Sequence, residues 1–358
     1  MIYWREACIA SIMLIICSVG ASAQFVPVEG KDGEGSPAET PKLKMLKTIR
    51  SAPFTGPPSI AEETDSALDD EKSADDDKTQ IGEDAWLAFS AFQRGQYITA
   101  MELALPRAQL GDPAAQTLIA ELFAEGFGVG RSMDDAVFWY DQAAKNGDAS
   151  AQYKLALLLT NGKYAEKDEK RARELMQKSA EGGNPKAQFN YAQLLVSERP
   201  GPKGIEDALP FFESAAARGI PDAQYALSQI YVNEIDVSEQ KRALARRHLI
   251  SAARAGYDTA RLDLAIWLID GVGGDRDFEA GFEWMRLAAL KGNVIAQNRL
   301  AHLYIQAIGT VGNPIEAGRW YIVSRRAGLE DPSLEDFYQG LTADEQKRSL
   351  EAANLMRF

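Results

Sequence analysis

One serine and one lysine have the spacing of a serine nucleophile and its activating base. They occur in Ser238-Glu239-Gln240-Lys241. Enzymes that use this pair also carry Ser-Asp-Asn and Lys-Thr-Gly motifs, and neither triplet occurs in the sequence. Ser238 precedes an expected helix, where a serine side chain most simply caps the helix N-terminus. The spacing therefore does not by itself predict a hydrolase.

Histidine and cysteine, which commonly bind metals or take part in catalysis, are scarce. The chain contains two histidines, His248 and His302, and two cysteines, Cys8 and Cys17. It has no His-Glu-x-x-His, Gly-x-Ser-x-Gly or phosphate-loop motif. We therefore expect no metal centre, no cofactor and no enzymatic activity.

The charge balance excludes some classes of partner. The 358 residues carry a formal net charge of −13 at pH 7. A nucleic-acid-binding protein needs a basic surface to neutralise phosphates, so nucleic acid is excluded as a partner. The same argument disfavours an anionic membrane surface.

The first 23 residues have the features of a secretory signal peptide. Arg5 precedes an uncharged apolar run from Ala7 to Gly20, and Ala21-Ser22-Ala23 provides a small-residue cleavage site before Gln24. Cleavage there would leave a cysteine-free protein, which suits an oxidising compartment. We expect a periplasmic or secreted protein; the alternative is an uncleaved segment that anchors the chain.

Residues 24–80 have the composition of a disordered linker. They contain six of the fifteen prolines, and their second half carries nine acids against one base between Glu62 and Asp77. Such a stretch cannot bury enough apolar surface to offset its chain entropy. One basic segment with interleaved apolar residues, Lys42–Arg50, interrupts it. This segment is either a short binding motif or part of a charge-balanced linker, and composition favours the linker.

The rest of the chain repeats with a period of 36 residues. An alanine recurs at steps of 36, 36, 36, 37 and 36, and a glutamine follows it in all but one case. A glycine series and a large-residue series run in phase with it. These series predict a solenoid over residues 111–328. The alanines are Ala115, Ala151, Ala187, Ala223, Ala260 and Ala296, and the glutamines are Gln116, Gln152, Gln188, Gln224 and Gln297.

Each period is expected to form two helices joined by a turn. Asp112-Pro113 and Asn184-Pro185 pair a helix-capping side chain with a proline at the first helical position. Small residues at fixed positions would let neighbouring helices approach closely, and the glutamines are expected to tie one helix to an adjacent turn. Residues 81–110 indicate one degenerate helix pair. Residues 329–358 indicate a C-terminal cap whose last helix continues to Phe358.

The pattern resembles the Sel-one-like repeat (SLR) family, which is related to the tetratricopeptide repeat. The best match runs from Ala115 to Gly147 and contains Gly126-Phe127-Gly128-Val129 and, from Ala136 to Ala144, the Ala-x-x-Trp-Tyr-x-x-Ala-Ala segment. The resemblance implies an all-α superhelix of helix pairs. It extends to bacterial cell-envelope members of the family, among them a rhizobial periplasmic regulator of exopolysaccharide. Some cysteine-rich relatives are linked to β-lactamase activity, but the repeat cysteines are absent here.

By analogy with the tetratricopeptide geometry, the first helices should line a concave binding face. Side chains two, six and nine residues after each repeat alanine would point into it, and Ile305 is the last of these in the final repeat. If the assumed register is wrong by one residue, these are core positions instead. The predicted face contains Tyr153, Leu157, Phe189, Gln193, Tyr225, Gln229, Leu262, Ile266, Asn298 and His302.

These observations predict a non-enzymatic adaptor or regulator in the bacterial cell envelope that binds a protein partner. Two alternatives remain open. One is a structural or polysaccharide-binding envelope protein, with transient association with the membrane or cell wall. The other, with less support, is a β-lactamase-like hydrolase built on Ser238. The sequence leaves the partner, the pathway and the oligomeric state unspecified.

Overall fold

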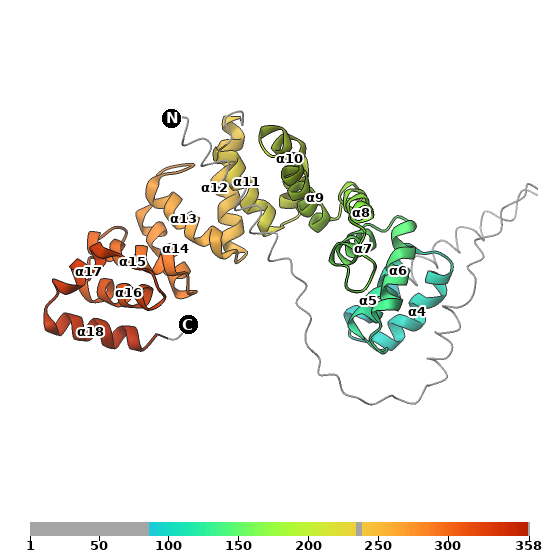
Figure 1. The fold of residues 1–358 in the computed structure, drawn as a ribbon, viewed down its shortest axis with the longest axis horizontal. Coiled ribbons are helices and arrows are strands. Elements are labelled where there is room, and N and C mark those ends of the chain that lie inside the picture. The colour runs from blue at the N-terminus through green and yellow to red at the C-terminus, as the bar shows by residue number, and fades with distance from the viewer. Residues whose placement is uncertain (1–85, 234–237, 357–358) are drawn as a thin grey trace, which may run out of the picture. The chain divides into compact units, whose positions relative to one another are not determined.

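The computed structural model describes residues 86–233 and 238–356 (Figure 1), and all regular structure in them is helical. The predicted signal segment 1–23 and the linker 24–80 lie outside these residues. Residues 86–93 are helical, and labelled helices follow. They are α4 (Tyr97–Gln109), α5 (Pro113–Glu125), α6 (Met133–Lys145), α7 (Ala149–Asn161), α8 (Glu169–Glu181), α9 (Pro185–Glu198), α10 (Pro202–Ala217), α11 (Pro221–Asn233), α12 (Glu239–Arg254), α13 (Asp258–Asp270), α14 (Phe278–Leu290), α15 (Val294–Gln306), α16 (Pro314–Arg326), α17 (Pro332–Gln339) and α18 (Ala343–Asn354).

Consecutive helices from α4 to α7 and from α9 to α16 pack against each other, as expected for an α-solenoid. Helices α5 to α16 form six pairs, and we number the repeats 1 to 6 from α5–α6 to α15–α16. The chain divides into two compact bodies, with the boundary between Leu175 and Met176 inside α8. Within the part of the chain that the structure describes, no helix is both long and apolar enough to span a membrane.

Local capping explains where the helices begin and end. The Asp112 carboxylate accepts hydrogen bonds from the backbone N–H groups of Ala114 and Ala115, at 2.9 and 3.2 Å. Pro113 then supplies a backbone angle that already suits a helix. At the other end, Gly126 adopts a φ of 75°, which a residue with a Cβ rarely takes. The same polar cap and glycine end recur along the chain.

Small residues form the contacts between paired helices. Ala136, Ala208 and Ala317 are fully buried on second helices. At the same slot in α14, a Cβ added to Gly281 would lie 2.6 Å from Cγ1 of Ile269. A larger side chain at these positions would force the paired helices apart. The small-residue series of the sequence therefore corresponds to the closest helix–helix contacts.

The repeated glutamines have the structural role expected of them. Each side-chain Nε2 donates to the carbonyl oxygen of an alanine eight residues earlier, in the last turn of the preceding second helix. The bonds measure 2.9–3.3 Å, and they join Gln116 to Ala108, Gln152 to Ala144, Gln188 to Ala180, Gln224 to Ala216 and Gln297 to Ala289. Each of these helix-end carbonyls also accepts the backbone N–H of the in-phase glycine, so the amide adds a second hydrogen bond that ties the first helix to the end of the preceding one.

Two helices, α17 and α18, follow the last repeat. Helix α18 begins with the predicted capping box between Thr342 and Glu345. Its Ser349 is buried against Gly318 of α16, where an added Cβ would lie 2.5 Å from the serine Oγ. The helix ends at Asn354, so the prediction that it continues to Phe358 was wrong.

Candidate interaction face

The ten residues of the predicted face fall into two groups in the structure. Tyr153, Leu157, Gln193, Gln229, Ile266, Asn298 and His302 are half-buried. Phe189, Tyr225 and Leu262 are buried in the apolar core, and Tyr225 is only 1% exposed. The expectation that these three side chains line an open face is therefore corrected: their rings and methyl groups pack inside the solenoid. A binding role for the other seven stays a prediction.

A polar cluster joins repeats 4 and 5 on this face. The Tyr225 hydroxyl donates to Oδ2 of Asp263 at 2.8 Å, and Nε2 of Gln229 donates to the same oxygen at 3.4 Å. The Tyr257 ring packs on the Tyr225 ring with a centroid separation of 4.9 Å. Burial raises the pKa of Asp263, and the hydrogen bond from Tyr225 and the charge of Arg299 offset only part of this effect. The Asp263 carboxyl therefore acts as a shared hydrogen-bond acceptor for side chains of the preceding repeat.

A second polar cluster joins repeat 6 to the cap. Asn298 donates to Oδ2 of Asp331 at 3.0 Å, and Nε2 of His302 lies 2.8 Å from the same oxygen. The other carboxylate oxygen caps α17 through the backbone N–H groups of Ser333 and Leu334. Burial raises the pKa of Asp331, but hydrogen bonds from Ser333, His302 and Asn298 outweigh it and hold this pKa well below its ordinary value. This carboxylate is therefore charged over the whole physiological pH range.

A corresponding polar contact lies in the N-terminal body, before Met176. Glu121 lies six residues after its repeat alanine, and its carboxylate pairs with the ammonium of Lys154 in the next repeat at 3.2 Å. Gln229 has the same position in its repeat, and its partner Asp263 has the position of Lys154. In repeats 1 and 4, the residue six places after the repeat alanine thus contacts the residue three places after the next alanine.

Sequence reasoning missed the second partner in these contacts. Asp263 and Lys154 lie three residues after the repeat alanines Ala260 and Ala151. A signal for them was present, because polar residues at this position interrupt an otherwise apolar helix pattern. Asp331-Pro332 has the same capping pattern as Asp112-Pro113, but the contacts of Asp331 with Asn298 and His302 depend on how α15 lies beside the start of α17.

Ser238 caps α12, as its place before an expected helix predicts. The Ser238 hydroxyl accepts a hydrogen bond from the backbone N–H of Lys241 at 3.3 Å. The Lys241 ammonium forms an ion pair with Glu213, which also accepts a 2.8 Å hydrogen bond from the Tyr231 hydroxyl. His248 packs edge-on against Tyr231, and its pKa is lowered by burial.

The residues that the structure describes contain no group of three or more acidic, histidine or cysteine side chains placed to hold a metal ion. This observation identifies no candidate metal site in residues 86–233 and 238–356.

Comparison with protein families identifies the repeat. A model described as the Sel1 repeat matches residues 113–148, 149–184, 185–220, 221–257, 259–293 and 294–329. The chain belongs to the Sel1 repeat family. These six matches coincide with the six helix pairs, and they confirm the predicted SLR resemblance and the all-α solenoid fold. The Sel1 repeat is generally a protein-interaction scaffold and is typically non-catalytic.

Solved structures agree with this assignment. A Sel1 repeat protein from Oxalobacter formigenes is 26% identical, with a TM-score of 0.55; the match covers 69% of this chain and 99% of that chain. A protective antigen of uropathogenic Escherichia coli, which displays an SLR fold, is 23% identical, with a TM-score of 0.50. That match covers 72% of this chain and 63% of the antigen, and it supports the fold alone. Among curated proteins, none matches this sequence.

Proposed function

We propose that this Sel1 repeat protein is a non-enzymatic adaptor or regulator of the bacterial cell envelope. It binds a protein partner through the exposed parts of its first helices. The N-terminal segment directs it to the periplasm or outside the cell, and cleavage follows Ala23. Membrane or cell-wall association is transient.

The observation that carries the proposal is the row of polar groups on successive first helices. Gln229 and Asp263 form one group, and Asn298, His302 and Asp331 form the next. These side chains are held in place by one another and remain half-buried, so each group keeps some access to solvent. Fixed hydrogen-bonding groups beside apolar side chains such as Ile266 are typical of protein-binding surfaces.

The test compares two variants that differ only in which helix they alter. Ile305 on first helix α15 and Leu287 on second helix α14 are each 37% exposed. Both Ile305→Glu and Leu287→Glu should therefore leave the core intact. After crosslinking in intact cells, we expect the Ile305→Glu protein to lose an envelope partner that the Leu287→Glu protein retains. Equal capture of the partner by the two variants would contradict binding through the first helices.

Localisation is tested separately. We expect cell fractionation to place the protein in the periplasm or the medium, and N-terminal sequencing to begin at Gln24. A full-length chain in the membrane fraction would instead favour the anchored alternative. Recovery from the cytoplasm alone would contradict both forms of the proposal.

A further inference from the structure

A second candidate binding site lies in the turn between the two helices of repeat 2, away from the first-helix face. Repeats 1, 2, 5 and 6 have turns of equal length, residues 126–132, 162–168, 271–277 and 307–313. In all four, the last turn residue donates its backbone N–H to a carbonyl near the end of the first helix. These bonds measure 2.8–3.2 Å and run from Ser132 to Phe123, Asp168 to Leu159, Asp277 to Leu268 and Asn313 to Tyr304.

Three of these turns pack directly on the second helix of the preceding repeat, and we call them the packed turns. The third residue of each packed turn is a glycine, and a Cβ added to it would approach the helix. At Gly128 it would lie 2.9 Å from Cβ of Tyr97, and at Gly273 it would lie 3.4 Å from Cβ of Arg246. At Gly309 it would lie 2.0 Å from the carbonyl oxygen of Phe278. All three glycines have a φ near 70°. At Gly128 and Gly309 only a residue without a side chain allows this close approach, whereas at Gly273 the positive φ alone favours glycine.

The turn of repeat 2, which we call the open turn, lacks both features of the packed turns. Its third residue is Tyr164, which does not have a positive φ. Its second residue is the exposed Lys163, whose ammonium lies 5.0 Å from the centre of the Tyr164 ring. At the second position of the first packed turn, Phe127 instead stacks on Tyr97 of the preceding second helix, at 4.5 Å between ring centres.

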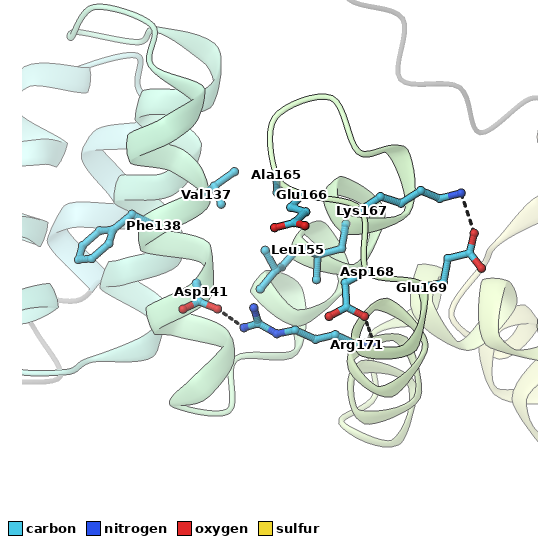
Figure 2. A pocket seen from close by; sticks show the side chains of 11 residues that line it. Val137, Phe138, Asp141, Leu155, Ala165, Glu166, Lys167, Asp168, Glu169 and Arg171 are labelled. Carbon is cyan, nitrogen blue, oxygen red and sulfur yellow. Dashed lines mark hydrogen bonds and ion pairs between the residues drawn. The ribbon is translucent and has the colours of Figure 1, made fainter.

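A cavity of about 890 Å³ lies between the open turn and α6 (Figure 2). Val137 and Leu155 point toward it, whereas the Phe138 ring points away from the turn. At one side of the cavity, the Asp141 carboxylate forms ion pairs with Arg171 and with Lys145. The Lys145 Nζ lies 2.7 Å from Oδ2 of Asp141. The opening therefore combines a small apolar floor with a charged rim.

The rim has an excess of negative charge. It contains the carboxylates of Asp141, Glu166, Asp168 and Glu169, against the cations Lys167 and Arg171. Lys167 pairs with Glu169 at 2.6 Å, and Arg171 pairs with Asp141. Glu166 extends from the turn toward α6 and forms no ion pair with another described residue. A carboxylate beside an apolar floor is suited to an aliphatic side chain with a lysine next to it.

We propose that the cavity binds the basic segment Lys42–Arg50 of this same chain. This segment has four cations, Lys42, Lys44, Lys47 and Arg50, interleaved with Leu43, Met45, Leu46 and Ile49. Leu46 enters the space above Val137 and Leu155, and the neighbouring Lys47 reaches the Glu166 carboxylate. The segment lies outside the described residues, so the support for this contact comes from the charges and apolar side chains of its sequence.

The connecting chain is long enough for this contact. Residues 51–85 separate Arg50 from Trp86, the first described residue. A flexible stretch of this length spans about 30 Å on average. The cavity belongs to a folded part of about 90 residues, whose radius of gyration is about 12 Å. The segment can therefore reach the open turn of its own chain, and the local concentration of an attached segment favours even a weak contact.

The test measures disulfide formation within the full chain. In a background with Cys8→Ser and Cys17→Ser, Leu46→Cys is combined with Ala165→Cys at the open turn. The matched control combines Leu46→Cys with Val129→Cys, the same position in the packed turn of repeat 1. With diamide as oxidant at low protein concentration, we expect at least five-fold more intramolecular disulfide with Ala165→Cys. Equal yields, or no disulfide in either protein, would overturn the proposal.

A second variant tests the cavity itself. Lys163→Phe with Tyr164→Gly converts the open turn to the Gly-Phe-Gly sequence of repeat 1 and should close the space against α6. In the Leu46→Cys/Ala165→Cys background, this change should lower the disulfide yield to that of the Val129→Cys control. The helical circular dichroism signal must be retained for the comparison. An undiminished yield in the folded protein would show that the contact does not depend on the cavity.

Discussion

The turns of repeats 1 and 2 have equal length but differ at their second and third residues. Gly126-Phe127-Gly128 and Gly162-Lys163-Tyr164 both begin with a glycine in the left-handed region, at φ values of 75° and 73°. The first turn packs on the preceding second helix through Gly128 and Phe127, whereas the second has Tyr164 and the exposed Lys163 at these positions. Within a repeat protein, a turn can therefore keep its length while its side chains change, and such a turn is free to acquire a different role.

The charges around the two turns follow the same difference. Leu105 in α4 and Asp135 in α6 occupy the positions that Asp141 and Arg171 occupy one repeat later. The Asp141–Arg171 ion pair beside the open turn therefore has no counterpart at the corresponding positions beside the packed turn of repeat 1. Apolar packing joins repeat 1 to the preceding helix pair, whereas repeat 2 meets repeat 1 at a site with a charged rim.

The largest effect is expected for Gly309→Ala in the packed turn of repeat 6. The new Cβ would lie 2.0 Å from the Phe278 carbonyl oxygen, at a φ of 67° that disfavours any side chain. We expect a loss of about 3 kcal/mol in the free energy of unfolding. Chemical denaturation measures it, with Tyr164→Ala at the same position of the open turn as the control. Similar losses in the two variants would contradict the distinction between the turns.

A smaller effect is expected at the second turn position. Phe127→Ala removes the stacking on Tyr97 and the ring contact with Phe92, and should lower the free energy of unfolding by about 2 kcal/mol. Lys163→Ala in the open turn should change it by less than about 0.5 kcal/mol, because Lys163 is exposed. Denaturation curves of the two variants measured side by side decide the point. A Lys163→Ala protein as unstable as Phe127→Ala would mean that the open turn is also packed.

The sequence predicts the repeat much better than it predicts the surface. Period, capping residues and the role of Gln116 depend on local geometry that recurs in each unit, so they can be read from spacing alone. The burial of Tyr225 depends on how far each first helix is rotated, and a small rotation exchanges core and surface positions. Its hydroxyl also contacts Asp263 in the next repeat, which spacing alone did not reveal.

Single departures from the pattern carry the remaining information. Tyr164 in place of a glycine marks the open turn. Ala307 occupies the position of Gly126 and Gly162 yet still adopts a φ of 55°. Tyr164 gives up the positive φ of the third turn position, whereas Ala307 keeps the positive φ of the first, and the sequence does not distinguish these outcomes. The neighbouring helix also contributes in repeat 6, where Gly309 approaches the Phe278 carbonyl oxygen.

The smallest effect concerns the ion pair beside the open turn. Burial raises the pKa of Asp141, but hydrogen bonds from Lys145 and Arg171 outweigh it and hold this pKa below its ordinary value. A carboxylate with a lowered pKa stabilises the folded state above the unfolded-state pKa of about 4, and this contribution disappears as the pH falls through the lowered value.

Arg171→Gln should therefore lower the free energy of unfolding by about 0.5 kcal/mol at pH 7, because partly exposed pairs are screened by water. The difference from the unaltered protein should shrink as the pH falls below the unfolded-state pKa of about 4 and disappear as the pH passes through the lowered pKa of folded Asp141. Denaturation curves at pH 7 and pH 3 measure the two differences, with Arg286→Gln in the exposed Arg286–Glu283 pair as the control. A difference that stayed constant with pH would assign the role of Arg171 to packing of its aliphatic stem, and the open turn would then be held by apolar contact as the packed turns are.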